Sequence, residues 1–316
     1  MINESEVYFS IGDGASSPFY LDGWLTWNEE KWGVIAEHVK YSQNGKDFPC
    51  IEGVLYVDKM GKVRQPPRNN YMPLLFKTSN TEKPERIYRQ YLDIMEIFVS
   101  DLLKRGIRGR IALPPGFLDA RPMQWFGLDV EIAYTFIQNL PIKTINGARS
   151  INKNINKASR LGYKVTVSDD WKSIVKCLEQ TELIKGFSHR TSVEEISHCA
   201  ELLGPEAFIG YLGYDEKGEP VSGGLRLMVK DGIVIDWSQG AYREHLNNGI
   251  NQLLYKYVLD DVYSKGGKIF DWCGANNAPV ALAKSAWGST LVPYLTIGEK
   301  DFRYAARAVR TVLKRK

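Results

Sequence analysis

Asp271 and Lys284 are the residues whose types and positions most directly suggest chemistry, and both lie in residues 268–297, KIFDWCGANNAPVALAKSAWGSTLVPYLTI. The apolar residues 268–272 predict a strand that ends near Asp271, and a glycine-containing turn separates it from the short segment that carries Lys284. A carboxylate there can orient an amine or accept its proton, and an ammonium can stabilise an oxyanion or neutralise a phosphate. The bland alternatives are a turn-forming Asp and a surface lysine.

The segment before this strand predicts how the strand is placed. Residues 251–267 have the spacing of an amphipathic crossover helix, so the strand at 268–272 is expected to run parallel to an earlier one. Polar groups at the carboxyl end of such a strand usually face a ligand crevice. A final strand is expected at residues 291–297.

Further candidates lie outside this segment. Asp236, in VIDWSQG, sits among apolar residues, where a carboxylate could act as a general base or simply hold buried hydrogen bonds. Asp119 and Arg121, in DARPMQW, are expected to form an ion pair that either braces the structure or contacts a ligand. His189 stands in a predicted loop beside Arg190, a pair that could bind an anionic acceptor. No Ser-His-Asp or Cys-His order is present, so a covalent acyl-enzyme is not predicted.

Composition excludes several classes. The chain has 316 residues, 44% hydrophobic and 25% charged, which is typical of a globular protein of about two domains. A net charge of +4 is too small to indicate DNA binding. The four cysteines show no zinc spacing, so no metal is expected and a reducing cytoplasm is the simplest location. No stretch approaches the ~18 apolar residues of a membrane span, and the first residues do not read as a signal peptide.

The predicted elements repeat their order in two halves. Dense aromatic residues at 8–46 predict turns followed by a helix near 29–40, and two amphipathic basic helices are expected at 146–162 and 301–316. In the first half, strands are expected at 50–57, 71–76, 110–113 and up to Leu140, with a helix at 84–105. In the second, they are expected at 207–214, 221–229, 233–239, 268–272 and 291–297, with a helix at 251–264. Two related lobes of class α/β, with mixed sheets, explain this repeat.

Three stretches in this order carry a resemblance to a known family: DARPMQWFGLDVEIAYTFIQNL, ARSINKNINKASRLGYKVTV and the segment 268–297. Together they resemble the Fem-type acyltransferases, the tandem-lobed branch of the GNAT fold that includes BioF2-like enzymes. The resemblance implies two GNAT-like lobes, 1–145 and 146–300, with the active cleft near the second and the helix at 301–316 packed back on the first. It also implies transfer of an acyl or aminoacyl group to an amine.

The resemblance also suggests roles for individual residues. Lys284 matches the lysine that relatives have ahead of a Phe-Gly or Trp-Gly pair, here Trp287-Gly288, and it is expected to be catalytic together with Asp271 and Asp236. The phosphate-binding loop of GNAT enzymes corresponds to AYREHLNNGINQLL, which keeps one glycine, although a helix N-terminus can still hold a phosphate. Expected donor-binding residues are Arg243, Asn248, Gly249, Lys153 and Lys157. Expected acceptor-binding residues are Asp119, Arg121, Trp125, Tyr134, His189, Arg190 and Trp287.

Three functions remain open at this point. The first is a cytoplasmic N-acyltransferase that uses acyl-CoA as a co-substrate, without a tightly bound cofactor, on an amino sugar, a nucleotide-linked sugar or a peptide amine of envelope or polysaccharide biosynthesis. The second is an aminoacyl-tRNA-dependent transferase of the peptidoglycan cross-bridge type, in which the basic helices would contact phosphates. The third is a non-catalytic protein whose degenerate lobe only binds a ligand.

Overall fold

A computed structural model of the chain describes residues 17–43, 46–117, 119–142, 149–186 and 191–300. The expected helix at 301–316 and the predicted acceptor residues His189 and Arg190 lie outside these ranges. The described chain forms two compact units. The first contains Asn28–Ala133 and the last strand from Pro293, and the second contains Tyr134–Val292 with the short stretch that ends at Trp27. The predicted lobes, 1–145 and 146–300, divide the chain by its repeated element order, whereas these two units divide it by contacts. The lobe boundaries therefore stay a prediction.

The first unit is built on an antiparallel sheet of β1 (Ile35–Ser42), β2 (Cys50–Val57) and β3 (Leu74–Lys77). The long helix α3 (Pro84–Arg105) turns Ile94, Phe98 and Leu102 into its core, at the spacing of one helix face. Pro84 starts this helix and Gly106, at φ +79°, ends it. The short elements β4 (Arg110–Ala112) and α4 (Arg121–Trp125) follow.

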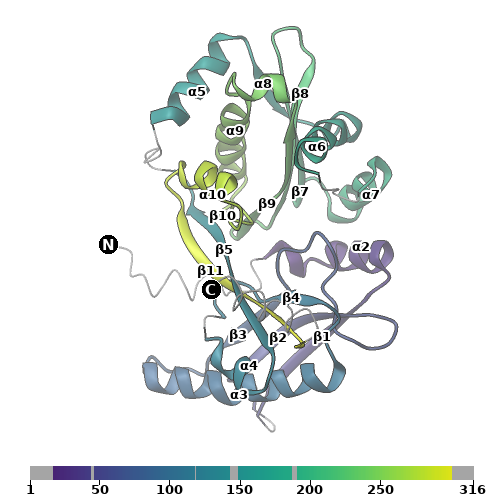
Figure 1. The fold of residues 1–316 in the computed structure, drawn as a ribbon, viewed down its shortest axis with the longest axis vertical. Helices are drawn as coiled ribbons and strands as arrows, with labels where there is room; N and C mark the ends of the chain where they lie inside the picture. The colour runs from purple at the N-terminus through teal and green to yellow at the C-terminus, as the bar shows by residue number, and fades with distance from the viewer. Residues whose placement is uncertain (1–16, 44–45, 118, 143–148, 187–190, 301–316) are drawn as a thin grey trace, which may run out of the picture. The chain divides into compact units, whose positions relative to one another are not determined.

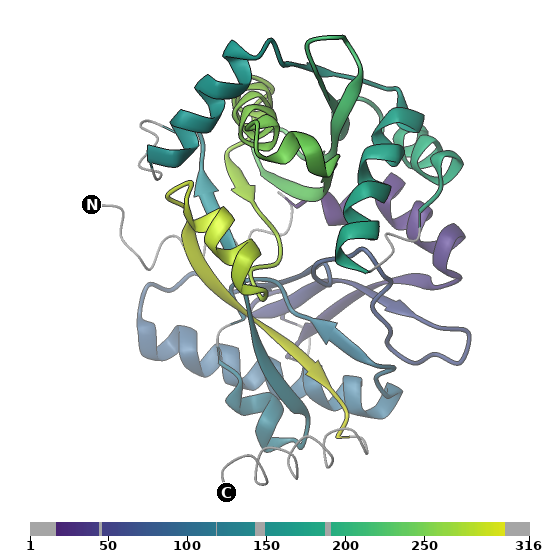
Figure 2. The ribbon, with the colours of Figure 1, turned by 45° about the horizontal axis from the view of Figure 1, so that its top comes forward.

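The second unit is a sheet in the order β5-β10-β9-β8-β7-β6, with helices on both faces (Figures 1 and 2). Helix α6 packs on β8 and β9 from one side, next to α7, and α9 packs on β7 and β8 from the other, beneath α5. These strands are β5 (Asp129–Asn139), β6 (Lys164–Val167), β7 (Phe208–Tyr214), β8 (Pro220–Met228), β9 (Ile233–Ala241) and β10 (Ile269–Asp271). Beyond β5 the same sheet continues with β11 (Thr290–Gly298), which runs into the first unit, and β4. The helices of the second unit are α5 (Arg149–Arg160), α6 (Trp171–Lys185), α7 (Val193–Leu203), α8 (Arg243–Leu246), α9 (Ile250–Ser264) and α10 (Ala278–Ser285).

The predicted repeat of element order is present: β1–β3, α3, β4, α4 and β5 of the first half correspond to β7–β9, α9, β10, α10 and β11 of the second, which also contains α5, β6, α6, α7 and α8. The last strands are exchanged between the halves. Strand β4 pairs with β11 of the second half (Ala112↔Thr296), whereas β10 pairs with β5 of the first half (Asp271↔Ile137). Strands β5 and β11, the last strands of the two halves, therefore each begin in one unit and end in the other.

The helix expected at residues 29–40 is wrong. Helix α2 spans Asp22–Trp32 and stops at Gly33, whose φ of +60° takes the chain out of the helix. Residues 35–42 then form β1, which pairs with β2 from Ile35↔Val57 to Ser42↔Cys50. Three helices and one strand of the second unit, α6, α7, α8 and β6, were not expected. No described helix is both long enough and apolar enough to cross a membrane.

Candidate active site

The sheet of the second unit opens between its two parallel strands. Strands β9 and β10 pair over three positions, ending at Ile235↔Asp271. Beyond that point β9 continues along β8 as far as Ala241, while the chain after β10 stays on β5, because Trp272 N donates to Phe136 O (2.9 Å) and Ala275 N to Tyr134 O (2.8 Å). The parallel arrangement predicted for the strand at 268–272 is confirmed, and its carboxyl end lies at this split.

A buried ion pair stands on the α9 side of the split. Arg226 of β8 is opposite Asp236 of β9, with Nη2 3.0 Å from Oδ1, and the two side chains are 0% and 5% exposed. Tyr255 of α9 donates from its hydroxyl to the other carboxylate oxygen (2.9 Å). Burial, and then the charge of Asp236, raises the pKa of Tyr255 well above its usual value, so this phenol stays a donor.

Arg226 also fixes the backbone beside the split. Its Nη1 donates to the carbonyls of Leu225 and Ser238, both at 2.9 Å, and its Nη2 to Gln239 Oε1 (2.7 Å). The pairing shifts here, since Leu225 faces Ser238 while Arg226 faces Asp236, so β9 carries one extra residue. The guanidinium thus holds a bulge in the strand that lines the split.

Lys284 of α10 lies across the start of the loop that follows β10. Its ammonium contacts the carbonyls of Trp272 and Cys273 and donates to Gly274 O at 3.1 Å. Three carbonyls use all three donors of an ammonium. Cys273 and Gly274 have φ of +49° and +60°, a conformation that turns consecutive carbonyls toward one side. Lys284 therefore places its positive charge at the split while fixing this loop.

Asp271 holds the same loop from the opposite side. Its Oδ1 accepts from Thr135 Oγ1 (2.5 Å) and from Cys273 N (2.8 Å), and the residue is 3% exposed. Burial, followed by the charge of Asp271, raises the pKa of the Cys273 thiol well above its usual value, with Lys284 acting in the opposite direction. The thiol is therefore a poor nucleophile. The structure thus brings two predicted catalytic residues, Asp271 and Lys284, to one loop, while the third, Asp236, lies across the split on β9 with its charge close enough to raise the pKa of Cys273.

Aromatic rings and unused polar atoms complete the α9 side. Trp272 packs against Tyr255 and Trp287, with ring centroids 4.8 and 5.5 Å away, which buries the predicted acceptor residue Trp287. Among the described residues, Arg226 Nε, Trp272 Nε1 and Gln252 Oε1 are buried without a hydrogen bond, and Asp236 Oδ1 has only its ion contact with Arg226. Buried polar atoms that lack partners are rare in folded proteins, so this cluster is suited to a polar ligand or to bound water.

Some of the predicted donor-binding residues contact other parts of the protein, and others are exposed to solvent. Gly249 begins α9 at φ +87°, and a Cβ on it would lie 2.2 Å from the Asn154 carbonyl, so its absence lets α5 approach. Lys157 Nζ donates to Asn247 O (2.8 Å), and Asn248 Nδ2 donates to the Tyr163 hydroxyl (3.1 Å). Lys153 instead lines an open hollow of about 470 Å³ together with Asn156, Ser159 and Arg160. Arg243 is exposed at the start of α8.

The predicted acceptor residues of the first unit form a local group. Arg121 binds Asp119 through Nε and Nη2, both at 2.9 Å, and it also donates to the Tyr88 hydroxyl (2.5 Å). The hydrogen bond from Arg121 lowers the pKa of Asp119. Trp125 is 64% exposed and lies 5.9 Å from the guanidinium. Tyr134 belongs to the second unit, where its backbone pairs with Ala275 and Asn276.

Sequence reasoning missed Arg226, Tyr255 and Thr135. Arg226 had a readable signal, because a charged residue in the apolar run VSGGLRLMV has to be buried with a partner if the run is a central strand. Tyr255 and Thr135 carried no such signal. Among the described residues, no group of three or more His, Cys, Asp or Glu side chains could hold a metal ion.

The sequence matches no protein-family model and no curated protein. Solved structures match over nearly the whole chain. The crystal structure of FemX has a TM-score of 0.62 at 12% identity, covering 93% of this chain and 96% of that one. The C-terminal domain of a putative lysylphosphatidylglycerol synthetase from Agrobacterium fabrum gives 0.57 at 10%, covering 96% and 94%. L-PGS from Bacillus licheniformis gives 0.52 at 14%, covering 87% and 90%. The chain therefore has the Fem-type, GNAT-like fold that its sequence resembles.

Proposed function

We propose that the chain is an N-acyltransferase that moves an acyl group from acyl-CoA to an amine of envelope or polysaccharide biosynthesis. The observation that carries this proposal is the split between β9 and β10, which has the Arg226–Asp236 pair of β8 and β9 on one side and the Lys284-bound loop after β10 on the other. An extended donor can bind along an open strand edge through the backbone. The solved structures of the same fold, FemX and the domain of a putative lysylphosphatidylglycerol synthetase, support a transferase. The cytoplasmic location and the envelope acceptor are parts of this proposal.

In the proposed reaction the acceptor nitrogen attacks the thioester carbonyl carbon. The tetrahedral oxyanion collapses by breaking the C–S bond, and the proton that the attacking nitrogen gives up passes to Asp236 and from it to the departing CoA thiolate. Asp236 stands beside the split, with Arg226 Nη2 3.0 Å from its Oδ1 and the Tyr255 hydroxyl on its other oxygen, and it is the carboxylate proposed to take the amine proton. Lys284 contributes its charge to the field at the oxyanion rather than a free N–H, because its donors are occupied. Asp271 fixes the loop.

The thiol-release assay tests this function. Purified protein is incubated with acetyl-CoA and a panel of amino sugars, nucleotide-linked amino sugars and peptide amines, and free thiol is followed. We expect slow hydrolysis that accelerates with one class of amine. Asp236→Asn should lower turnover by about a hundredfold to ten-thousandfold, the usual range of general acid–base contributions. Asp260→Asn, an exposed carboxylate on α9, is the matched control. No release with any amine would contradict acyl-CoA chemistry.

A second candidate is aminoacyl transfer from tRNA, favoured by the basic hollow on α5. Lys153 and Arg160 line this hollow, while Lys157 is bound to Asn247. Incubation with radioactively charged alanyl-tRNA or lysyl-tRNA and the same amines distinguishes the donors, since only this reaction is abolished by ribonuclease. If neither donor is consumed but an amine binds, the protein is the non-catalytic ligand-binding class.

The basic face of α5 is proposed to contact donor phosphates in either reaction. Replacing Lys153, Lys157 and Arg160 by alanine should raise the Michaelis constant of the donor and weaken its dependence on salt. Because Lys157 also holds Asn247, the double variant Lys153→Ala and Arg160→Ala separates charge from packing. Lys172→Ala with Lys176→Ala, two exposed lysines on α6, is the control. An unchanged Michaelis constant at low salt would leave α5 a solvated helix.

A further inference from the structure

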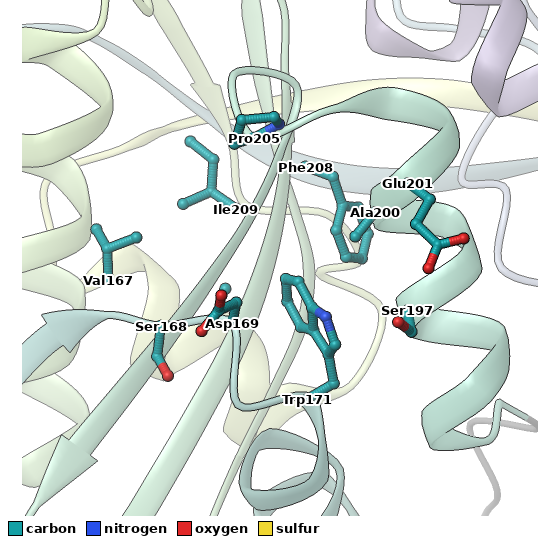
Figure 3. A pocket seen from close by; sticks show the side chains of 11 residues that line it. Val167, Ser168, Asp169, Trp171, Ser197, Ala200, Glu201, Pro205, Phe208 and Ile209 are labelled. Atoms are coloured by element: carbon teal, nitrogen blue, oxygen red, sulfur yellow. The ribbon is translucent and has the colours of Figure 1, made fainter.

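A second concave site lies on the α6 side of the sheet in the second unit, where the proposed reaction uses no residue. A cavity of about 610 Å³ opens between the end of β6, the start of β7 and the two helices α6 and α7. Figure 3 shows its side chains, with Asp169 and Trp171 at the start of α6 and Ser197 and Glu201 on α7. The chain leaves the sheet edge just before it, at Ser168, whose N–H still donates to Gly210 O (2.9 Å).

The floor and one wall of this cavity are apolar and aromatic. Trp171 lies beside the buried Phe208, with ring centroids 5.7 Å apart and tilted by 54°. Gly210 makes room for the indole, because a Cβ there would stand 2.7 Å from Trp171 Cζ3 and 2.3 Å from the Ser168 carbonyl. Val167 and Ala200 add aliphatic surface. The indole is only partly buried, so part of it remains available to a ligand.

The charge of the cavity has one sign. Two carboxylates, Asp169 and Glu201, are among its lining residues, and both are exposed; the described residues that line it include no lysine, arginine or histidine. His198 lies nearby, with Nδ1 3.7 Å from Glu201 Oε2. A tryptophan face and carboxylates both favour an organic cation, the first through its quadrupole and the second through charge.

We propose that this cavity binds a primary ammonium carried on an apolar stem, with the stem against Trp171 and Phe208 and the ammonium toward Asp169 or Glu201, which lie on opposite sides of the indole (Figure 3). Two sources supply that chemistry: a free amine, or a lysine side chain of a bound peptide. This site is separate from acyl transfer in its residues, and its binding can be measured without turnover.

Calorimetric titration with three phenyl compounds of similar size tests the sign of the charge. Phenethylammonium should bind in the millimolar range or tighter, while 2-phenylethanol and 3-phenylpropionate should bind at least about fivefold more weakly, as expected for a desolvated cation against aromatic and carboxylate groups. A capped pentapeptide, Ala-Val-Lys-Val-Ala, is the second arm. Tighter binding of the peptide assigns the site to a lysine side chain, and tighter binding of the amine assigns it to a free amine.

Substitutions of the lining residues test whether phenethylammonium binds in this cavity. Asp169→Asn with Glu201→Gln keeps the shape and should weaken phenethylammonium binding about tenfold, and Trp171→Leu should weaken it several-fold. Glu194→Gln, another exposed glutamate of α7 that does not line the cavity, is the control and should change nothing. Equal binding of the three phenyl compounds, or unchanged binding in the Asp169/Glu201 variant, would overturn the proposal.

Discussion

The two halves place the same kind of ion pair in opposite surroundings. In the first half, Lys77 of β3 binds Glu52 of β2 at 2.6 Å, with side chains 35% and 34% exposed. In the second, Arg226 of β8 binds Asp236 of β9 at 3.0 Å, with side chains 0% and 5% exposed. A half-exposed pair contributes little, whereas a buried pair carries a desolvation penalty that its mutual attraction often fails to offset.

The comparison indicates where function lies. Both pairs join the second and third strands of their half, so the element order alone does not require a buried charge there. The second half keeps one beside the split between β9 and β10. Among the described residues both halves bury polar atoms without a hydrogen bond, such as Tyr56 Oη in the first and Trp272 Nε1 in the second, so the buried ion pair is what distinguishes the second half. An arrangement that costs stability and faces an opening is expected where a ligand is bound.

Removing the guanidinium should give the largest difference between the halves. Arg226→Met leaves Asp236 buried without its partner and should lower the free energy of unfolding by about 3–5 kcal/mol. Glu52→Gln should lower it by about 0–1 kcal/mol. Denaturant unfolding measures both, and Arg226→Met with Asp236→Leu should recover much of the loss. Equal losses of stability in Arg226→Met and Glu52→Gln would contradict the proposed difference between the buried and the partly exposed ion pair.

Glycines at positive φ sharpen the comparison. Gly249→Ala should destabilise by about 2–4 kcal/mol, since it adds backbone strain and a clash with Asn154 O. Gly61 in the first half has φ +77° with nothing within 4 Å of a built Cβ, so Gly61→Ala should cost only the strain, about 1 kcal/mol. Thermal melts of both variants check this. A larger loss of stability in Gly61→Ala than in Gly249→Ala would contradict the close contact between Gly249 and α5.

The short helices of the two halves provide a third contrast. Lys284→Met keeps the side-chain stem but leaves three carbonyls without their donor, and turnover should fall about tenfold to a hundredfold while the fold persists. Arg121→Met on α4 removes an exposed pair with Asp119 and should leave turnover of a saturating acceptor nearly unchanged. Steady-state kinetics of both variants measures the two effects. Wild-type turnover in Lys284→Met would contradict the proposed role of Lys284.

The smallest effect concerns the pH dependence of the Asp119–Arg121 pair. Arg121 lowers the pKa of Asp119 below its usual 3.8, so this carboxylate adds stability above that pH and loses it as the pH falls through the lowered pKa. Asp119→Asn should therefore be less stable than the wild type by at most about 1 kcal/mol at pH 7, because Arg121 is largely exposed. The difference should shrink toward zero in unfolding measurements near pH 2. A constant difference would contradict the ion pair.

Much of the fold followed from local signals in the sequence. Pro84 and Gly106 marked both ends of α3, and the strands 50–57, 207–214, 221–229 and 233–239 agree closely with the structure. Helix α7 also had a signal that was not used, the capping box of Ser192 and Glu195. The exchange of β5 and β11 had none, because an apolar pattern sets which face of a strand is buried but not which distant strand it pairs with.

The site followed from the sequence only in part. Asp271 and Lys284 were predictable from their place after a parallel strand, and the structure does bring them to one loop. Their partners were not predictable, since the carbonyls that bind Lys284 depend on the positive φ of Cys273, a residue type that rarely adopts it. Gly249 was interpreted as a phosphate-binding glycine, whereas its contact is with the backbone of α5.

Hydrogen exchange of the backbone amides, with and without acetyl-CoA, tests most directly whether the donor binds in the split of the second half. The account predicts slower exchange in residues 236–241 and 272–276 when the donor is bound, and no change in β2 and β3. Slowing confined to β2 and β3, or consumption of the donor without any slowing at the split, would contradict it.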